Sequence, residues 1–471
     1  MSASSSPARR VRAVAAAPTS DAPRVSVIGT GYLGATHAAA LAELGFTVIG
    51  VDTDPAKVAA LEKGDTPFFE PGLPELIRAH VAGGGLSFTT DLGAAVAASD
   101  IHFICVGTPQ QPASHAADLS YVEAATRAVA AALTHDGLIV GKSTVPVGTA
   151  AGLRDIVAET TPASIGVELI WNPEFLREGR AVDDTLHPDR IVLGGASAHA
   201  EALMRTLYAK PLAAGAPLIA CDLPTAELVK VSANAFLATK ISFINAIAGL
   251  CERAGADVAV LADAIGHDAR IGRAFLNAGL GFGGGCLPKD IRALMHRAGE
   301  LGAYNTVKLM QHVDEINMDQ RQRVVDITLE ALGGSALNTR VAVLGAAFKP
   351  DTDDVRDSPA LNVAAALHLR GALVTVYDPE ASVTARRNFP TLGYSPDMES
   401  AVRGADVVLV LTEWDEIRAV SPAALGALAH RRIVIDARSC IPVAEWEAAG
   451  WDVRVLGRVY RPKQHAAVAA A

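Results

Sequence analysis

Residues 24–34 read RVSVIGTGYLG, an apolar, β-branched run that meets a glycine-rich turn. Gly29, Gly31 and Gly34 follow the spacing G-x-G-x-x-G, and a stretch with helical spacing continues to Leu44. Glycines at this spacing let a strand turn tightly into a helix, and they let the backbone approach a pyrophosphate at the helix N-terminus. The stretch therefore predicts the first strand–loop–helix unit of a Rossmann-like fold.

The next predicted strand, FTVIGVD at 46–52, ends in Asp52. A carboxylate at this position accepts a hydrogen bond from a ribose 2′-hydroxyl and repels a 2′-phosphate. The sequence therefore predicts NAD⁺ rather than NADP⁺ as the cofactor. Lys57 stands in the helix predicted from about residue 55 to residue 63. It is either a partner of the adenosine phosphates or a solvated helix lysine.

Further predicted strands alternate with helical segments, which indicates βαβ units and a parallel sheet. These strands are 100–107, 137–144, 167–172 and 190–195. From Pro224 a helix of about 30 residues begins, and more helices are expected around 257–266, 290–302 and 304–332. Strands return at 340–345, 373–378, 405–412 and 432–436. We therefore predict an α/β protein with two Rossmann-like, doubly wound domains joined by a long central helix and a helical domain.

The domain boundaries follow from this pattern. We expect a disordered tail at 1–23, an NAD-binding domain at 24–220 and a central helical domain at 221–333. A second Rossmann-like domain is expected at 334–462, followed by a disordered tail at 463–471. Its first loop, LGAAFKP, lacks the glycine pattern, and Asp378 ends its second strand. This domain is therefore expected to bind a different nucleotide.

Composition excludes several other classes of protein. The 471 residues carry a net charge of −10, which disfavours nucleic acid or an anionic membrane as the main partner. Five scattered cysteines without a C-x-x-C pair disfavour a disulfide framework or a structural metal site, and they fit a reduced cytoplasm. No apolar run in the sequence reaches the ~20 residues that span a bilayer.

The segment GLGFGGGCLPKD, 279–290, is the most informative for chemistry. Its glycines allow close backbone approach and expose amide donors. Cys286 stands just before a predicted helix, whose N-terminus would stabilise a thiolate together with Lys289. Asp290 lies about one helical turn further on, where it could orient a base or a water. The other four cysteines are interpreted as small buried apolar side chains.

A nicotinamide site combined with a nucleophilic cysteine indicates a four-electron oxidation of a primary alcohol to a carboxylate. The first hydride transfer gives an aldehyde, to which the thiolate adds. The thiohemiacetal then loses a second hydride, and water cleaves the resulting thioester. Without the cysteine, oxidation would tend to stop at the aldehyde.

Other polar residues fit this chemistry or have a simpler explanation. Glu174 and Glu178 lie four apart in NPEFLREGR and would share a face if the segment is helical, either as a base for water or as a solvated acidic surface. Lys230 and Asn234, also four apart, would stabilise an oxyanion or simply face solvent. Thr144 ends a strand near the expected nicotinamide, where it could hold a water or form a turn.

Together these segments resemble the UDP-glucose/GDP-mannose dehydrogenase family. The resemblance extends from about Arg24 to Tyr460. It rests on the motifs GTGYLG, FFEPGL, CVGTP, STVPVGT, NPEFLREG, KVSANAF, GFGGGCLPKD and FKPDTDDVRDSP. It implies NAD-dependent oxidation of a nucleotide sugar for polysaccharide biosynthesis, with UDP-glucose converted to UDP-glucuronate as the first expectation. GDP-mannose and a UDP-N-acetylhexosamine are the alternative substrates.

The resemblance also implies roles for individual residues. Cys286 would be the nucleophile and Glu174 the general base, Asp290 and Thr144 would position water, and Lys230 with Asn234 would stabilise the oxyanion. NAD⁺ contacts are implied at Gly29, Gly31, Tyr32, Leu33, Gly34, Asp52, Lys57, Thr108, Thr144, Glu178, Lys289 and Arg356. UDP-sugar contacts are implied at Glu174, Phe175, Leu176, Lys230, Asn234, Arg270, Phe282, Gly283, Lys349 and Arg438.

The resemblance implies a homodimer through the central domain, with Arg270 reaching the substrate of the neighbouring subunit. The sequence departs from the family at Gly285, where serine is usual. The glycine gives the loop more freedom and removes a hydroxyl. Pro350 stands where a second lysine is sometimes found.

Two other classes of function remain open. A hydroxyacid dehydrogenase of similar architecture would transfer two electrons rather than four, and a non-catalytic nucleotide-binding protein would transfer none.

Overall fold

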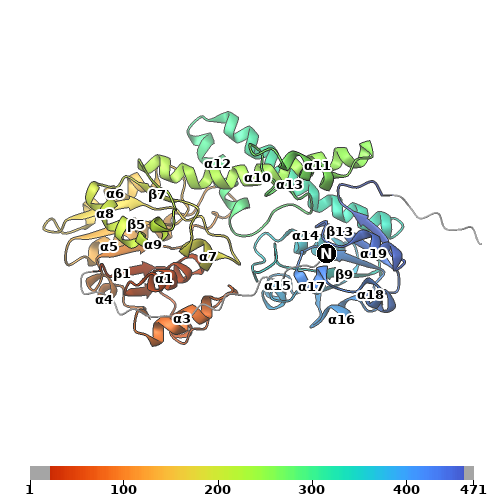
Figure 1. The fold of residues 1–471 in the computed structure, drawn as a ribbon, viewed down its shortest axis with the longest axis horizontal. Coiled ribbons are helices and arrows are strands. Elements are labelled where there is room, and N and C mark those ends of the chain that lie inside the picture. Colours follow the sequence, from red (N-terminus) through yellow and green to blue (C-terminus); the bar gives the residue numbers. More distant parts are fainter. Residues whose placement is uncertain (1–21, 461–471) are drawn as a thin grey trace, which may run out of the picture. The chain divides into compact units, whose positions relative to one another are not determined.

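The structure, a computed structural model, describes residues 22–460 as two compact units (Figure 1). The first unit comprises the described residues up to Thr108 together with Leu119–Glu227, and the second comprises Pro109–Asp118 and the described residues from Leu228 onward. The tails predicted at 1–23 and 463–471 lie outside the described residues, apart from Ala22 and Pro23.

The first unit is built on an eight-stranded sheet in the order β3-β2-β1-β4-β5-β6-β7-β8. The strand order reverses beside β1 and β4, which is where doubly wound sheets bind nucleotides at their carboxyl ends. The strands are β1 (Val25–Ile28), β2 (Val48–Val51), β3 (Leu86–Thr89), β4 (Ile101–Ile104), β5 (Gly137–Gly141), β6 (Val167–Trp171), β7 (Ile191–Gly194) and β8 (Leu218–Cys221).

Helices cover both faces of this sheet (Figure 1). One group is formed by α1 packed against α3 and α7, and another by α5 packed against α4 and α6. The helices are α1 (Tyr32–Leu44), α2 (Pro55–Leu61), α3 (Leu73–Ala82), α4 (Leu92–Ala97), α5 (Ser120–Ala132), α6 (Thr149–Thr160), α7 (Ala181–Leu186), α8 (Ala198–Leu207) and α9 (Ala209–Ala213). Small side chains on α1, including Ala35, Ala38 and Ala39, are fully buried and let it lie close to β1.

The predicted strands of the first unit are present, but the sheet differs from the prediction in two ways. All neighbouring strands are parallel except β6 and β7, which meet antiparallel at Trp171 and Gly194. The edge strands β3 and β8 were not predicted. A strand at the edge of a sheet has a neighbour on one side only and is less buried, as β8 is, which weakens its apolar pattern.

The second unit contains a six-stranded, all-parallel sheet in the order β11-β10-β9-β12-β13-β14. Its strands are β9 (Arg340–Leu344), β10 (Leu373–Tyr377), β11 (Gly393–Tyr394), β12 (Val407–Val410), β13 (Ile433–Asp436) and β14 (Asp452–Val455). Its helices around this sheet are α14 (Pro359–Leu369), α15 (Ser382–Asn388), α16 (Met398–Val402), α17 (Asp415–Arg418), α18 (Pro422–Leu428) and α19 (Val443–Ala448). The second Rossmann-like sheet is therefore confirmed.

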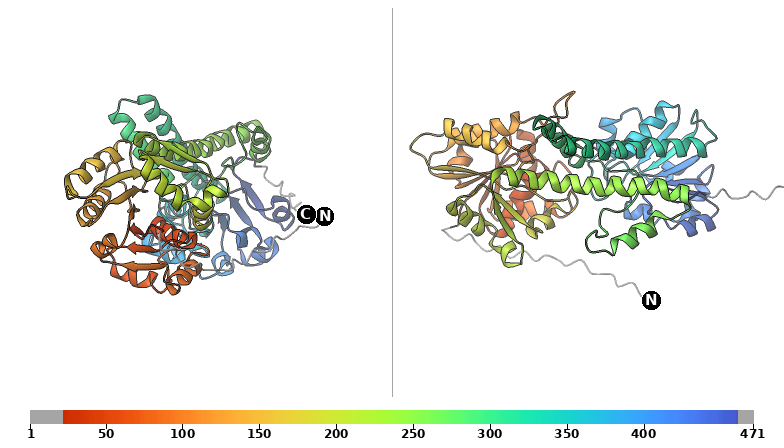
Figure 2. Two further views of the ribbon diagram at one scale, coloured as in Figure 1. Left: turned by 60° about the vertical axis from the view of Figure 1, so that its left-hand side comes forward. Right: turned by 90° about the horizontal axis from the view of Figure 1, so that it is seen from above.

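The helical middle of the chain consists of α10 (Leu223–Ala254), α11 (Val258–Gly266), α12 (Leu287–Glu300) and α13 (Tyr304–Ala331). Figure 2 shows α10 as one continuous helix, as the sequence predicts. By length and composition it is the one helix within 22–460 that could cross a membrane. It carries buried polar residues, among them Glu227, Lys230 and Asn234, and it is a core helix of this protein rather than a membrane span.

Candidate active site

The glycine loop between β1 and α1 has the geometry that the sequence predicts. A Cβ on Gly34 would lie 1.8 Å from the carbonyl oxygen of Gly29, so α1 can begin against this loop only with glycine there. A Cβ on Gly31, in contrast, would have no heavy atom within 4 Å. The space in front of Gly31 is therefore open to a ligand, next to the first turn of α1.

Asp52 lies at the end of β2 and is 9% exposed. Its Oδ2 accepts hydrogen bonds from the backbone N–H and hydroxyl of Thr30 and from Lys57 Nζ at 2.9 Å. Burial tends to raise the pKa of this carboxyl, but the hydrogen bonds from Lys57 and from the amides of Asp54 and Thr30 lower it overall. Asp52 is therefore held as an anion, with Lys57 as its partner rather than as a fully solvated helix lysine.

The segment that carries Glu174 and Glu178 is not helical. Residues 172–177 are extended or irregular, and α7 begins only at Ala181. Glu174 Oε2 accepts the backbone N–H of Leu176 at 2.7 Å, which forms a local side-chain turn. The expected shared helix face of the two glutamates is therefore wrong. Directly after Glu178 the chain turns at Gly179, which has a φ of 80° and donates its N–H to Glu70, so no helix continues through this segment.

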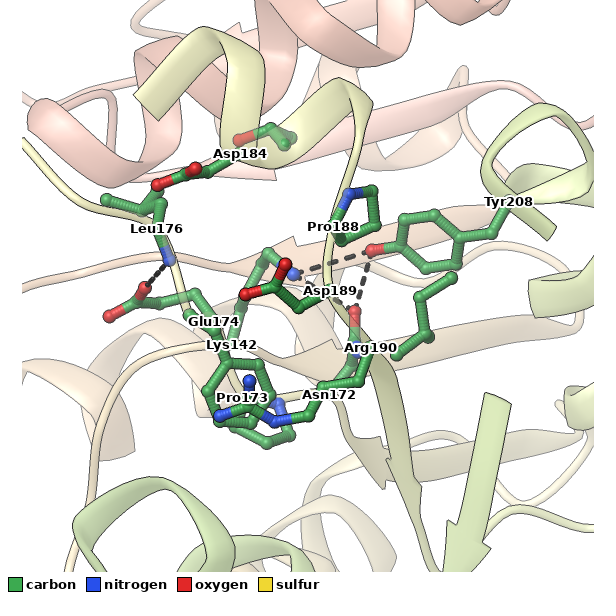
Figure 3. Close-up of a pocket in the computed structure, with 13 residues that line it drawn as sticks. Lys142, Asn172, Pro173, Glu174, Leu176, Asp184, Pro188, Asp189, Arg190 and Tyr208 are labelled. Carbon is green, nitrogen blue, oxygen red and sulfur yellow. Dashed lines mark hydrogen bonds between the residues drawn. The ribbon is translucent and has the colours of Figure 1, made fainter. Parts of the chain in front are cut away.

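Residues of this segment line a small pocket in the first unit (Figure 3). Lys142 Nζ donates to Asn172 Oδ1 at 3.0 Å and to the Tyr208 hydroxyl at 3.4 Å, and Tyr208 donates to the same amide oxygen. The rest of the lining comes from Pro173, Glu174, Phe175, Leu176, Asp184, Thr185, Pro188, Asp189, Arg190 and Ile191. The pocket thus adjoins Glu174, Phe175 and Leu176, which the sequence assigns to the substrate.

The pKa of the nearby Cys105 thiol is influenced by two charged residues that line this pocket. Burial raises the pKa of the Cys105 thiol to about 12, with Lys142 lowering it and Glu174 raising it. Both charged groups are therefore close enough to act on one buried thiol. This also confirms the interpretation of Cys105 as a buried, unreactive cysteine.

Thr108 and Thr144 meet beside β4 and β5. The Thr108 hydroxyl donates to the backbone carbonyl of Thr144 at 2.8 Å, and Ser143 donates to the carbonyl of Val106 at 2.7 Å. These bonds join two loops at the carboxyl end of the sheet, where the nicotinamide is expected. The Thr144 side chain is half-buried in this arrangement.

Cys286 is exposed and stands at the N-cap position of α12, as predicted. The backbone N–H of Asp290 bonds to the carbonyl of Cys286 at 2.9 Å, so Asp290 lies one turn into the helix. Dipoles at a helix N-terminus favour an anion, which promotes the thiolate form of a cysteine there.

Asp290 gathers two of the other predicted residues around it. Its carboxylate is 2% exposed and accepts Asn234 Nδ2 and Lys289 Nζ, each at 2.7 Å. Lys230, one turn before Asn234 on α10, is also buried. Lys289, which the sequence predicts to stabilise the cysteine thiolate, is thus paired with Asp290 in the structure. Asn234 and Lys289 are therefore joined to Asp290, one helical turn from Cys286, and Lys230 lies one turn from Asn234 on α10.

The glycines before Cys286 are explained by close packing. A Cβ on Gly284 would meet the Phe348 ring at 2.8 Å, and one on Gly285 would meet the Arg356 guanidinium at 2.3 Å. At Gly285 a Cβ would meet only the far end of the exposed Arg356 side chain, which can move, so the freedom expected for this position stays a prediction. Gly283 is likewise closed off by the carbonyl of Asp357 at 2.4 Å and by Pro359.

Phe282 contributes its backbone rather than an open ring. Its side chain is 5% exposed and packs with Ala235, Ile291 and Met310 in an apolar cluster. Asn317 bonds to both its N–H and its carbonyl, at 2.7 and 3.0 Å. An aromatic contact from Phe282 to a ligand is therefore not supported by this packing, whereas its neighbouring backbone is firmly fixed.

Arg438 and Lys349 lie in the second unit, as does the glycine-rich segment 279–290 that carries Cys286, here called the cysteine loop. The Arg438 guanidinium donates to the carbonyls of Leu411, Gly281 and Phe348 at 2.7, 3.3 and 3.0 Å. It therefore joins the cysteine loop to the loops that follow β9 and β12. Lys349 Nζ lies 5.8 Å from the Phe348 ring centroid.

Arg356 and Arg270 are both held by an aspartate two residues before them. Arg356 bonds to Asp354, with Nη2 at 2.7 Å from Oδ2, and Arg270 bonds to Asp268 at 2.6 Å. Arg270 is highly exposed, on a loop that Lys240 of α10 ties down by donating to the carbonyls of Ile271 and Gly272.

Comparison with known proteins identifies the family. Sequence profiles of the UDP-glucose/GDP-mannose dehydrogenase family match its NAD binding domain at residues 23–212, its central domain at 224–319 and its UDP binding domain at 342–442. The chain belongs to the UDP-glucose/GDP-mannose dehydrogenase family. Residues 23–212 therefore form its NAD-binding domain and residues 342–442 its UDP-binding domain.

Individual relatives span nearly the whole chain. A UDP-glucose 6-dehydrogenase of Rhizobium meliloti (strain 1021) is 43% identical, covering 92% of this chain and 99% of that protein. A UDP-glucose dehydrogenase structure from Pyrobaculum islandicum has a TM-score of 0.86 at 38% identity, covering 93% of this chain and 99% of that one. A UDP-D-ManNAc dehydrogenase structure from Pyrococcus horikoshii has a TM-score of 0.80 at 27% identity, covering 92% and 99%.

The residues of the first unit fit NAD⁺. The open space at Gly31, the N-terminus of α1 and the ionised Asp52 are the three parts that a dinucleotide needs for its pyrophosphate and ribose. No group of three or more histidine, cysteine or acidic side chains placed to hold a metal ion occurs within 22–460.

Several residues that shape the site were missed by the sequence analysis. Asn317 and Arg321 of α13 hold the backbone of Phe282, and Lys142 lines the pocket beside Glu174. Glu70 bonds to the glycine-loop residue Tyr32. Each is a single polar residue without a spacing partner, so only its motif context, such as KST or FFEPGL, marked it in the sequence.

Proposed function

We propose that this protein is a UDP-glucose 6-dehydrogenase that oxidises C6 of UDP-glucose to the carboxylate of UDP-glucuronate. The observation that carries the proposal is the exposed Cys286 at the start of α12, with Asp290 and Asn234 joined one turn away, in a chain with full-length UDP-glucose 6-dehydrogenase relatives. A thiol in this place is what separates a four-electron dehydrogenase from a two-electron one.

The reaction includes two oxidations, first of the alcohol to an aldehyde and then of a thiohemiacetal to a thioester. Bound NAD⁺ accepts one hydride in each of them. Cys286 adds as thiolate to the aldehyde carbon, giving a thiohemiacetal, and loss of a hydride from that carbon leaves a thioester. Water then breaks the carbon–sulfur bond, releasing the carboxylate and the Cys286 thiol. Two NADH form for each sugar, and no other oxidant is required.

Roles for the polar residues follow from their chemistry. We assign the buried Lys230 and Asn234 as donors to the alkoxide and to the oxyanion of the later steps. Asp290, which holds Asn234 and Lys289, and Thr144 position the hydrolytic water. Glu174 accepts the proton of that water. Glu174 lines the pocket of the first unit, and its carboxylate accepts the backbone N–H of Leu176.

Cofactor and substrate contacts are proposed at the remaining residues. On the NAD⁺ side these are Gly29, Gly31, Tyr32, Leu33, Gly34, Asp52, Lys57, Thr108, Glu178, Lys289 and Arg356. On the UDP-sugar side they are Phe175, Leu176, Phe282, Gly283, Lys349 and Arg438, with Phe282 acting through its backbone.

We propose a homodimer through the central domain. Phe236, Phe243 and Leu250 recur every seven residues on α10 and are 66%, 50% and 60% exposed. Such a stripe on a long helix favours pairing with an apolar partner, and a second copy offers the same stripe. Arg270 of one subunit would then reach the substrate of the other. In sedimentation, Phe243→Asp should give a monomer, while Leu369→Asp on α14 should not.

A cytoplasmic location is proposed on the cysteines. All five are free in the structure, which suits a reducing compartment. Cell fractionation with a marker for each compartment tests this point.

The substrate is tested by measuring NADH formation with UDP-glucose, UDP-galactose, GDP-mannose and UDP-N-acetylmannosamine. We expect the highest kcat/KM with UDP-glucose and two NADH for each UDP-glucuronate. Greater activity with GDP-mannose or the N-acetylated sugar would make that sugar nucleotide the substrate, within the same family. One NADH per sugar would instead support a two-electron dehydrogenase and reject the thioester steps.

A further inference from the structure

The motif FFEPGL, 68–73, has no role in the mechanism above, yet its carboxylate is deeply buried in the NAD-binding domain. Glu70 is 2% exposed and lies in the loop between α2 and α3. A buried carboxylate is costly unless several donors compensate for its lost water. The hydrogen-bond donors around the Glu70 carboxylate therefore indicate its role.

Three donors from two distant segments converge on Glu70. Its Oε1 accepts the backbone N–H of Ala181 at 2.7 Å, and its Oε2 accepts the N–H of Gly179 at 2.7 Å. The Tyr32 hydroxyl donates to the same Oε2. Glu70 thus joins the first turn of α1, at the glycine loop, to the chain that leads into α7.

Tyr32 is fixed in two further ways. Its ring lies 4.8 Å from that of Phe68, in the same motif as Glu70. Its hydroxyl is 2.9 Å from the Gly179 nitrogen. Burial and the bond to Glu70 raise the pKa of Tyr32, and Glu178 raises it further, so Glu178 lies near this phenol. The hydroxyl therefore remains a donor to Glu70 across the physiological pH range.

We propose that Glu70 is a positioning residue for NAD⁺: by holding Tyr32 and the Gly179–Ala181 backbone together, it fixes the glycine loop relative to Glu178. The inference rests on the cofactor part of the proposed function. Tyr32 directly follows Gly31, beside the open space where the pyrophosphate fits. A loop that is already ordered loses less conformational entropy when the dinucleotide binds.

A purely structural role for Glu70 predicts a different result. In that case its loss would lower stability but leave the affinity of folded protein for NAD⁺ unchanged. The proposal requires the affinity for NAD⁺ to fall, with the affinity for UDP, which belongs to the other domain, unaffected. The ratio of the two affinities therefore separates positioning from stability.

The experiment measures the dissociation constants of NAD⁺ and UDP by calorimetry on full-length protein without any sugar, alongside thermal melting. Glu70→Gln keeps the shape but places an amide N–H₂ among three donors, and we expect its Kd for NAD⁺ to rise about tenfold. Tyr32→Phe leaves both backbone bonds to Glu70 and should raise it about threefold. The matched control is Glu75→Gln on α3, an exposed glutamate paired with Arg78, which should change neither constant.

Unchanged NAD⁺ affinity in folded Glu70→Gln would overturn the proposal. If that variant fails to fold, Tyr32→Phe decides, and a wild-type Kd for NAD⁺ in Tyr32→Phe overturns it equally. Because no sugar is present, failure of the UDP-glucose assignment would leave this result intact. In the turnover assay, Glu70→Gln should raise the KM for NAD⁺ with little change in the KM for the sugar.

Discussion

The two sheets of this protein end their second strand in the same residue type, Asp52 in one and Asp378 in the other, and they use it differently. Two of the four donors to Asp52 are side chains, the Thr30 hydroxyl and Lys57. Asp378 accepts four backbone N–H groups and the indole of Trp414. Side chains can turn away when a ribose hydroxyl arrives, whereas backbone amides and a buried indole remain in place.

The loops that follow the first strand of each sheet, β1 and β9, also differ. In the first sheet α1 begins at Tyr32, directly after the glycine loop, so its N-terminus lies beside the open space at Gly31. In the second sheet α14 begins only at Pro359, after a long loop that carries Lys349 and Arg356. Asp378 bonds to Ala346 and Ala347, the positions that correspond to the open glycine loop. One framework thus binds a dinucleotide through a helix end, and the other offers charged loops to a different nucleotide.

The largest effect is expected from Asp378→Ala. It leaves five donors, four of them buried, without their acceptor, and we expect a loss of about 3–5 kcal/mol in the free energy of unfolding. Urea unfolding followed by circular dichroism measures it. Asp52→Ala should cost about 1–2 kcal/mol, because Lys57 and Thr30 can turn to water. Equal losses at the two aspartates would break the comparison.

Gly31→Ala should separate binding from folding. Its Cβ meets no atom within 4 Å, so the melting temperature should stay near that of the wild type. The methyl group would occupy space needed by the pyrophosphate, and the Kd for NAD⁺ should rise about tenfold or more. Gly152→Ala on α6, whose Cβ also meets nothing, is the control and should leave the Kd unchanged. Normal NAD⁺ binding by Gly31→Ala would show that the cofactor does not approach this loop.

Asp52→Asn gives the smallest effect, a change of cofactor preference. Removing the negative charge removes repulsion of a 2′-phosphate, so the preference for NAD⁺ over NADP⁺ in kcat/KM should fall about tenfold. Turnover at matched concentrations of both cofactors measures this ratio. Because the lowered pKa of Asp52 keeps the wild-type carboxyl ionised, the wild-type preference should persist down to about pH 6, where the 2′-phosphate itself begins to take up a proton. A ratio unchanged by Asp52→Asn would remove this residue from the ribose site.

Much of the fold follows from the sequence, because its signals are local. The run VSVIGTGYLG gives β1, the glycine loop and α1, and the uninterrupted stretch after Pro224 gives α10. The placement of Cys286 at a helix start could be predicted because Pro288 and Lys289 follow a glycine loop directly. Edge strands such as β3 and β8 lack a strong local pattern and depend on pairing with β2 and β7.

The parts that sequence reasoning missed depend on contacts distant in the chain. NPEFLREGR has acidic residues at helical spacing, but Glu174 bonds to its own turn and the segment stays irregular. The close packing of Gly283 against the Asp357 carbonyl and Pro359 likewise depends on residues distant in the chain. Glu70 and Asn317 bond to residues far away in sequence, Gly179 and Phe282, and no spacing rule connects such pairs.

The central claim, that Cys286 carries the substrate between its two oxidations, is tested most directly by product analysis of Cys286→Ser. Purified variant and wild type are mixed with UDP-glucose and excess NAD⁺, and UDP-glucuronate and NADH are counted over time. The wild type should give two NADH for each carboxylate, and Cys221→Ser, a control at a half-exposed cysteine on β8, should do the same. We expect Cys286→Ser to lose the complete oxidation, so that UDP-glucuronate does not form at a rate near that of the wild type. Carboxylate formed by Cys286→Ser at the wild-type rate would contradict the account.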